Sequence, residues 1–312
     1  MLLELDNLVK RYENHLAVDH LSLNVREGEI MGLLGPNGAG KTTTLNIITG
    51  LTGMDHGTIR VFGIDIGSNG QEIKQDIGLV PQEIAIFDDL TAKENVTFFG
   101  KLYGLRGALL KERTREALDF VGLGSRAGQF PRNFSGGMKR RLNIACAISH
   151  KPRLIIMDEP TVGIDPQSRN HILESVRTLQ REGSTILYTS HYMEEVDEIC
   201  TRIAIMDQGR IIAQGTSEEL KTMISSEEKI EMTLSEINYT LVDEIKKLEG
   251  VLECHGEERK LTVLARKDSG LIGQISLIIG HSGSEIYSLQ VDKVTLESVF
   301  LTLTGKSLRD TG

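Results

Sequence analysis

The sequence predicts an α/β fold with a large first domain, residues 1–225, and a small α+β domain, residues 226–312. Three observations lead to this prediction. A glycine-rich loop lies between an apolar strand and a helix, a second apolar strand ends in two acidic residues, and after residue 225 short strands alternate with amphipathic helices. A chain of 312 residues is long enough for one large and one smaller domain.

The glycine-rich loop runs from Gly35 to Thr43 and has the form G-x-x-x-x-G-K-[ST]. Its backbone N–H groups are expected to point into one hollow at a helix N-terminus, where an anion is favoured. Lys41 would then reach the β- and γ-phosphates of a nucleotide, and the Thr42 hydroxyl would bind Mg²⁺. The alternative is a chance glycine turn, which average composition produces in roughly one chain of this length in a hundred.

The apolar run 154–157 predicts a strand buried on both faces, as in a parallel sheet. It ends in Asp158 and Glu159, at the edge where open α/β sheets bind their ligands. Adjacent residues of a strand point to opposite sides, so the two acids should differ in task. We expect Asp158 to hold Mg²⁺ and Glu159 to be the general base for an attacking water. A solvated strand end would be the commoner reading without the phosphate loop.

A third motif, Asn133–Arg141, contains the turn Ser135-Gly136-Gly137. Ser135 is a natural helix N-cap and the glycines expose backbone amides, which makes a second anion site. Alone, it would be an ordinary capped helix start. Together, the three motifs resemble the ATP-binding cassette family over about residues 2–220. The resemblance implies a P-loop NTPase core with an antiparallel β subdomain and a helical insert, and hydrolysis of ATP with Mg²⁺ as cofactor.

The same resemblance implies four further roles. Gln82 would bind Mg²⁺ and sense a transmembrane partner, and His191 would contact the γ-phosphate. Asp165 would cross a dimer interface, and Tyr12 would lie under the adenine. From the residues alone, a histidine at a strand end is more often structural, and a surface tyrosine is the alternative for Tyr12. Three positions depart from the usual family pattern without removing a phosphate ligand: Phe134, Met138 and Ile164.

The predicted site residues fall into three overlapping groups. The nucleotide-binding group is Tyr12, Gly35, Pro36, Asn37, Gly38, Ala39, Gly40, Lys41, Thr42, Thr43, Gln82, Ser135, Gly136, Gly137 and Asp165; the catalytic group is Glu159 and His191; the metal group is Thr42, Gln82 and Asp158. A nucleotide in the first loop lacks contacts on the outer side of its γ-phosphate. A second copy, or a related cassette, would supply them from its Ser135–Gly137 in a head-to-tail dimer.

Composition and charge exclude several classes of protein. A net charge of −9 argues against a nucleic-acid partner, which requires a basic face. The three cysteines are far apart, which suits a reducing cytosol without disulfides. The start shows no secretion signal, and no apolar stretch approaches the ~18 residues of a spanning helix. We therefore expect a peripheral subunit on the cytoplasmic face of the membrane, with integral-membrane permease subunits as partners.

Around the loop, residues 3–25 and 57–63 alternate as strands of an antiparallel sheet, and residues 91–149 are mostly helical. A capping box at Thr91–Glu94 starts one helix, and residues 111–121 form another. In the resembled family this helical insert docks the transmembrane subunit. Residues 202–213 predict a hairpin.

The last part predicts the order β-α-β-β-α-β, a ferredoxin-like split motif. Strands are expected at 229–234, 251–254, 260–265 and 285–291, and helices at 241–248, 270–279 and, to close the chain, 295–301. We expect this domain to regulate or to dimerise, with an open apolar sheet face that needs a partner. The ending resembles the exporter branch of antibiotic-resistance, lipid and polysaccharide transporters. An importer subunit and a soluble cassette ATPase of translation or DNA repair are the rival interpretations.

Overall fold

The computed structural model describes residues 1–67, 73–224, 227–267, 269–292 and 294–305. The chain divides into two compact units, Met1–Ser217 with Leu303–Gly312, and Glu218–Thr302. The predicted boundary at residues 225–226 lies outside the described residues. Among the described residues, no helix is both long enough and apolar enough to cross a membrane.

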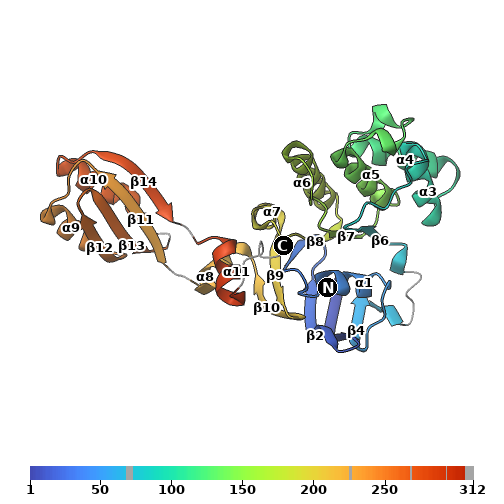
Figure 1. Ribbon diagram of the computed structural model, residues 1–312, viewed down its shortest axis with the longest axis horizontal. Helices are drawn as coiled ribbons and strands as arrows, with labels where there is room; N and C mark the ends of the chain where they lie inside the picture. The colour runs from blue at the N-terminus through green and yellow to red at the C-terminus, as the bar shows by residue number, and fades with distance from the viewer. Residues whose placement is uncertain (68–72, 225–226, 268, 293, 306–312) are drawn as a thin grey trace. The chain divides into compact units, whose positions relative to one another are not determined.

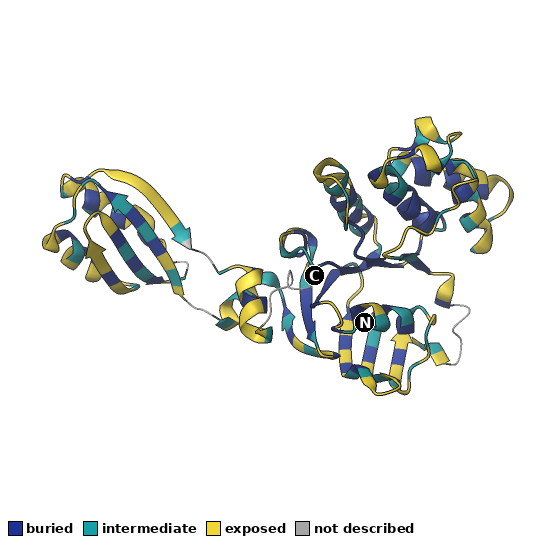
Figure 2. Cartoon of the chain, in the orientation of Figure 1, coloured by how far each residue is buried: buried dark blue, intermediate teal, exposed yellow. Residues whose placement is uncertain are grey.

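A six-stranded sheet of order β10-β9-β3-β8-β7-β6 forms the centre of the first unit (Figure 1). Its strands are β3 (Ile30–Leu34), β6 (Ile77–Val80), β7 (Leu154–Asp158), β8 (Thr185–Thr189), β9 (Arg202–Asp207) and β10 (Arg210–Gly215). All neighbours are parallel except β9 and β10, the predicted hairpin. Every residue of β3, β7 and β8 is buried, and for β7 this confirms the burial predicted from the apolar run 154–157 (Figure 2). Parallel pairing brings the ends of these three strands, and the segments that follow them, to one edge.

The predicted antiparallel sheet has the order β2-β1-β4-β5. Its strands are β1 (Leu3–Tyr12), β2 (His15–Val25), β4 (His56–Val61) and β5 (Ile64–Asp65). Apolar side chains alternate along β1 and β2, and they share one hydrophobic core with α1 (Lys41–Ile48) and β3. The helix that follows the glycine-rich loop is therefore held by apolar contacts to both sheets.

A second core joins the helices to the other side of the large sheet. The helices are α3 (Ala92–Leu102), α4 (Gly107–Phe120), α5 (Gly136–Ile148), α6 (Pro166–Arg181) and α7 (Met193–Ile199), with short 3₁₀ turns at Gly124–Arg126 and Pro131–Asn133. The capping box is confirmed, since Thr91 Oγ1 accepts from the Glu94 amide and Glu94 accepts from the Thr91 amide. Helix α4 begins four residues before the predicted Lys111.

The second unit has the predicted ferredoxin-like order, an antiparallel sheet β12-β13-β11-β14. Its elements are α8 (Ser217–Ile224), β11 (Glu227–Leu234), α9 (Tyr239–Lys246), β12 (Val251–Glu257), β13 (Lys260–Arg266), α10 (Leu271–His281), β14 (Ile286–Asp292) and α11 (Leu296–Thr304). Helix α8 begins one residue before the unit, and α11 ends two residues after it. As predicted, Ile230, Met232 and Leu234 lie on one face of β11, where they share a core with α9 and α10 (Figure 2).

The other sheet face differs from the expected apolar surface. Alternating with the buried residues of β11 are Lys229, Glu231 and Thr233. Glu231 forms ion pairs with Lys229 at 2.6 Å and with Lys260 on β13 at 2.8 Å. This face is polar because its side chains pair with one another across strands, so an apolar partner is not required there.

Candidate nucleotide site

A hollow of about 240 Å³ lies where the phosphate loop meets the antiparallel sheet. It is lined by Tyr12, His15, Ala17, Pro36, Asn37, Gly38, Ala39, Gly40, Lys41, Thr42, Thr43, Gln82 and Glu159. The structure thus brings together most of the predicted nucleotide-binding residues. Tyr12, at the end of β1, is 44% exposed, as an aromatic platform for a base would need to be.

Backbone conformation holds the loop in shape. Gly40 has φ +101°, and a Cβ there would lie 2.3 Å from the Ala17 carbonyl oxygen, so only glycine fits. The Ala39 amide donates to the Pro36 carbonyl at 3.1 Å, and the Gly209 amide donates to the Ala39 carbonyl at 2.9 Å. The loop is therefore fixed by contacts to β2 and to the β9–β10 turn.

Lys41 is only 6% exposed, although it carries a cation. Its Nζ donates to the carbonyls of Gly35 at 2.7 Å and Pro36 at 3.2 Å, and lies 3.9 Å from Glu159 Oε1. Burial lowers the pKa of Lys41, and the charges of Glu159 and Asp158 oppose that shift. A phosphate in the loop would replace weak carbonyl contacts with a full opposite charge.

Asp158 and Thr42 present oxygen atoms side by side. The Thr42 hydroxyl donates to Asp158 Oδ2 at 3.0 Å, and the Thr189 hydroxyl donates to Asp158 Oδ1 at 2.6 Å. Oxygen ligands suit Mg²⁺, which proteins hold through one or two carboxylates together with substrate phosphates. Within the part of the chain that the structure describes, no three His, Cys, Asp or Glu side chains cluster as a metal site would require.

Glu159 follows β7 with φ +46°, a left-handed conformation that few residues adopt. The strand alternation that separates neighbouring acids therefore ends at Asp158, and both carboxylates lie beside the loop. Glu159 Oε2 accepts from Gln82 Nε2 at 3.4 Å and lies 3.2 Å from His191 Nδ1. The His191 contact, assisted by the charge of Lys41, lowers the pKa of Glu159 against the effect of burial. Glu159 is thus a carboxylate at neutral pH.

The Ser135–Gly137 turn and Asp165 do not line the hollow. Ser135 is the predicted N-cap of α5, accepting from the Met138 amide at 3.3 Å, and Asp165 caps α6 by accepting from the Ser168 amide at 2.9 Å. A Cβ on Gly137 would lie 2.1 Å from Ser168 Oγ and 3.2 Å from Asp165 Oδ2. The two capped helix starts therefore lie against each other within one chain.

Four residues near the site were not predicted. His15 and Ala17 line the hollow from β2, and Thr189 bonds both Asp158 and the Glu159 amide. Arg140, on α5, is buried and donates to the carbonyls of Pro81 at 2.8 Å and Gln82 at 2.6 Å. Thr189 is the last residue of the buried strand β8, and a polar residue at a strand end two positions before His191 was the available signal for it. His15, Ala17 and Arg140 carried no such signal, because none of them occupies a motif position that is expected to contact phosphate.

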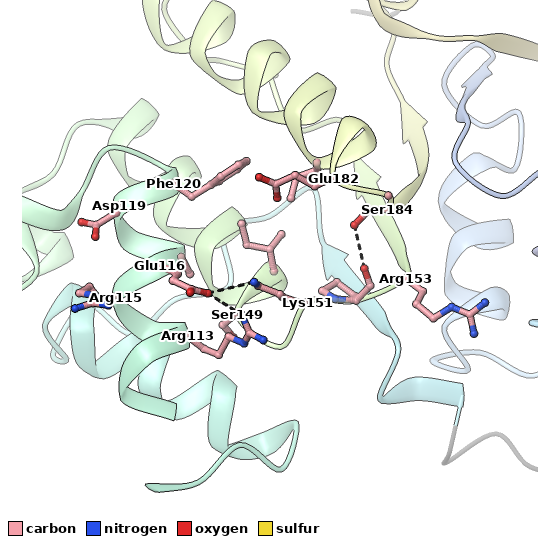
Figure 3. A pocket seen from close by; sticks show the side chains of 15 residues that line it. Arg113, Arg115, Glu116, Asp119, Phe120, Ser149, Lys151, Arg153, Glu182 and Ser184 are labelled. Atoms are coloured by element: carbon pink, nitrogen blue, oxygen red, sulfur yellow. Dashed lines mark hydrogen bonds and ion pairs between the residues drawn. The ribbon is translucent and has the colours of Figure 1, made fainter. Parts of the chain in front are cut away.

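Figure 3 shows a second, larger hollow of about 810 Å³ that no predicted site residue lines. Three of its charged side chains pair with one another, since Glu116 contacts Arg113 at 2.8 Å and Lys151 at 3.3 Å. The Ser184 hydroxyl donates to the Pro152 carbonyl at 3.1 Å. Volume alone would favour this hollow, but the smaller one is lined by the glycine-rich loop together with Gln82 and Glu159.

Comparisons with known proteins show which family the chain resembles along its length. A family described as ABC transporter matches residues 18–162. The linearmycin resistance ATP-binding protein of Bacillus subtilis is 47% identical over 99% of this chain and 100% of its own length. The daunorubicin/doxorubicin resistance ATP-binding protein of Streptomyces peucetius is 37% identical over 99% and 94%, and the Nod factor export ATP-binding protein of Cupriavidus metallidurans is 38% identical over 99% of both.

Solved structures give the same picture for the fold. An ATP-binding subunit of an ABC transporter superposes with a TM-score of 0.66 at 30% identity, covering 72% of this chain and 93% of that one. A dimeric ATP-binding cassette in a post-hydrolysis state, bound to ADP and phosphate, superposes with a TM-score of 0.62 at 28% identity, covering 69% and 98%.

Proposed function

This chain belongs to the ABC transporter family and is an ATP-binding, ATP-hydrolysing subunit; on that premise, we propose that it energises the export of amphiphilic compounds through separate membrane subunits. The observation that carries the export proposal is the alignment of 99% of the chain with proteins of antibiotic resistance and Nod factor export. The match extends through the second unit, and so is not limited to the cassette common to importers and exporters.

The hollow supports a specific division of labour in hydrolysis. Glu159 would accept the proton of the attacking water, since it is ionised and is positioned by two polar neighbours. Lys41 would offset negative charge on the β- and γ-phosphates. His191, beside Glu159, would contact the transferring phosphoryl group.

The oxygen atoms of Thr42 and Asp158, with Gln82, would hold Mg²⁺. The Gln82 amide nitrogen is directed at Glu159, so its carbonyl oxygen is the atom that would bind a cation. The ion would supply further neutralisation of phosphate charge. The contact of Thr42 with Asp158 at 3.0 Å supports this assignment, because one cation could bind both.

A second cassette would complete the nucleotide site. Ser135, Gly136, Gly137 and Asp165 lie outside the hollow of their own chain, and Gly136 has no other atom near where a Cβ would lie. Ser135 and Gly136, the exposed residues of this turn, would contact the γ-phosphate of a partner's ATP, in a head-to-tail dimer at the cytoplasmic face of the membrane. The dimeric relative with ADP and phosphate supports such an assembly.

The export proposal is tested in a daunorubicin-sensitive bacterium that expresses this chain with the membrane protein encoded beside it. We expect less intracellular daunorubicin with the parent chain than with Glu159→Gln, because only the parent turns over ATP. A parallel culture with an unrelated polar antibiotic is the control. Equal accumulation of daunorubicin in both strains would contradict export of this class, and greater uptake with the parent would favour an importer.

A further inference from the structure

Glu195 is a buried acid that the proposed hydrolysis does not use. It lies on α7, is 1% exposed, and accepts three hydrogen bonds on one oxygen. The donors to Oε2 are the hydroxyls of Thr161 at 2.8 Å, Tyr188 at 2.8 Å and Ser190 at 3.0 Å. The Nε of Arg169 lies 2.5 Å from the other oxygen as an ion pair.

These partners come from the segments that carry the candidate catalytic and interface residues. Thr161 lies in the loop between Glu159 and Asp165, whose turns are closed by amides of Val162 and Ile164 donating to the carbonyls of Glu159 and Thr161 at 3.3 Å. Ser190 directly precedes His191. A single carboxylate thus joins the turn that holds His191 to the loop that leads to Asp165.

Further contacts hold together the same two segments, the turn that holds His191 and the loop that leads to Asp165. Ser190 Oγ also accepts from the Tyr192 amide at 2.9 Å, which closes the turn around His191. Arg169 belongs to α6, the helix capped by Asp165, and its guanidinium lies 4.7 Å from the centre of the Tyr192 ring. Burial, and then the Glu195 charge, raise the pKa of Tyr188 well above 10, so its phenol stays protonated and donates.

A buried carboxylate costs free energy unless it is paired and hydrogen-bonded, and here both conditions are met. Its removal would leave three hydroxyls without their acceptor and the Arg169 guanidinium without its counter-charge. A neutral amide would retain one acceptor oxygen but would lose the charge facing Arg169. The geometry therefore depends on the carboxylate and not merely on a side chain of this size.

We propose that Glu195 is a positioning residue for ATP hydrolysis, which fixes the His191 turn and the Glu159–Asp165 loop in one arrangement. It acts through these segments without touching the nucleotide. Through this junction, a contact made by Asp165 with a second cassette would be transmitted to His191. This inference rests on the proposed roles of His191 and Asp165.

The test compares Glu195→Gln with Glu194→Gln, the exposed neighbour on the same helix. For Glu195→Gln we expect kcat to fall about 10- to 100-fold, because a displaced catalytic group slows chemistry strongly. Equilibrium affinity for ATP should stay within about twofold, because the loop around Lys41 is unchanged. Glu194→Gln should match the parent. Parent-like kcat in Glu195→Gln, or an equal loss of affinity and kcat, would overturn the inference.

A double variant separates positioning from general loss of structure. With His191→Ala already present, Glu195→Gln should slow hydrolysis by less than about threefold further, because both changes act on one unit. If Glu195→Gln lowered the rate of hydrolysis by the same factor in the parent and in His191→Ala, coupling through His191 would be contradicted. If Glu195→Gln unfolds, the test uses Thr161→Val and Ser190→Ala, each of which removes one hydroxyl that donates to Glu195. Their kcat values are then compared with that of the parent in the same way. A parent chain without ATPase activity would instead refute the proposed function.

Discussion

At the scale of single residues, the sequence predicted best those side chains that a linear motif carries. Residues 36–43 follow one another along the chain, so the spacing alone places them around one hollow. Ala17 and His15 reach the same hollow from β2, where nothing local distinguishes them from other strand residues. The left-handed turn at Glu159 was equally hidden, because the side chains that contact its carboxylate, those of Lys41, Gln82 and His191, come from distant parts of the sequence.

Lys41→Ala is expected to weaken ATP binding by about 1.5–3 kcal/mol, the usual contribution of a hydrogen bond to a charged group. The variant lacks the buried ammonium that would contact the phosphates, whereas the loop keeps the hydrogen bond from the Gly209 amide to the Ala39 carbonyl. Isothermal calorimetry on the variant measures this difference. Lys101→Ala, at an exposed position of α3, is the control and should bind like the parent. Unchanged affinity in Lys41→Ala would remove this residue from the nucleotide site.

At the scale of elements, caps were more predictable than packing partners. Ser135 and Thr91 were identified as helix N-caps from their neighbours in sequence, and their side chains accept the expected amides. Helix α4 begins earlier than predicted, at Gly107, because glycine weakens a helix prediction without preventing the helix. That Gly137 would lie against Ser168 of α6 could not be read from either segment alone.

Substitutions at the two glycines of the Ser135–Gly137 turn are expected to differ in their effect on stability. Gly137→Ala should destabilise the chain by about 1–3 kcal/mol, because the new methyl would overlap Ser168 Oγ. Gly136→Arg meets open space, so its stability should change by less than about 0.5 kcal/mol. Chemical denaturation of both variants checks this contrast. A stable Gly137→Ala together with an unfolded Gly136→Arg would contradict the packing described for the start of α5.

At the scale of the whole molecule, the order of strands and helices was predictable in both units, because period and turn residues change sharply along the chain. The polar outer face of the second sheet was not, since the expectation of an apolar face came from the fold class and not from Lys229, Glu231 and Lys260. We propose that this unit regulates or stabilises the dimer without contributing to hydrolysis.

A chain ending at Ile224 is therefore expected to fold and to bind ATP with the parent affinity, because the residues that line the hollow all precede Thr161. Its basal turnover or its self-association should differ from the parent. Fluorescent-nucleotide titration and circular dichroism measure affinity and folding separately. A truncated chain that folds but does not bind ATP would show that the second unit contributes to the site.

The central claim, that two cassettes close around ATP with Glu159 as the base, is tested most directly by sedimentation velocity of Glu159→Gln. Loss of a general base slows hydrolysis by about 10²–10⁴-fold, so bound ATP should persist and hold a dimer. We predict that Glu159→Gln is a dimer with ATP and Mg²⁺ and a monomer with ADP. The double variant with Gly136→Arg should be a monomer with either nucleotide. A monomer with ATP bound, or a dimer that forms despite Gly136→Arg, would contradict the account.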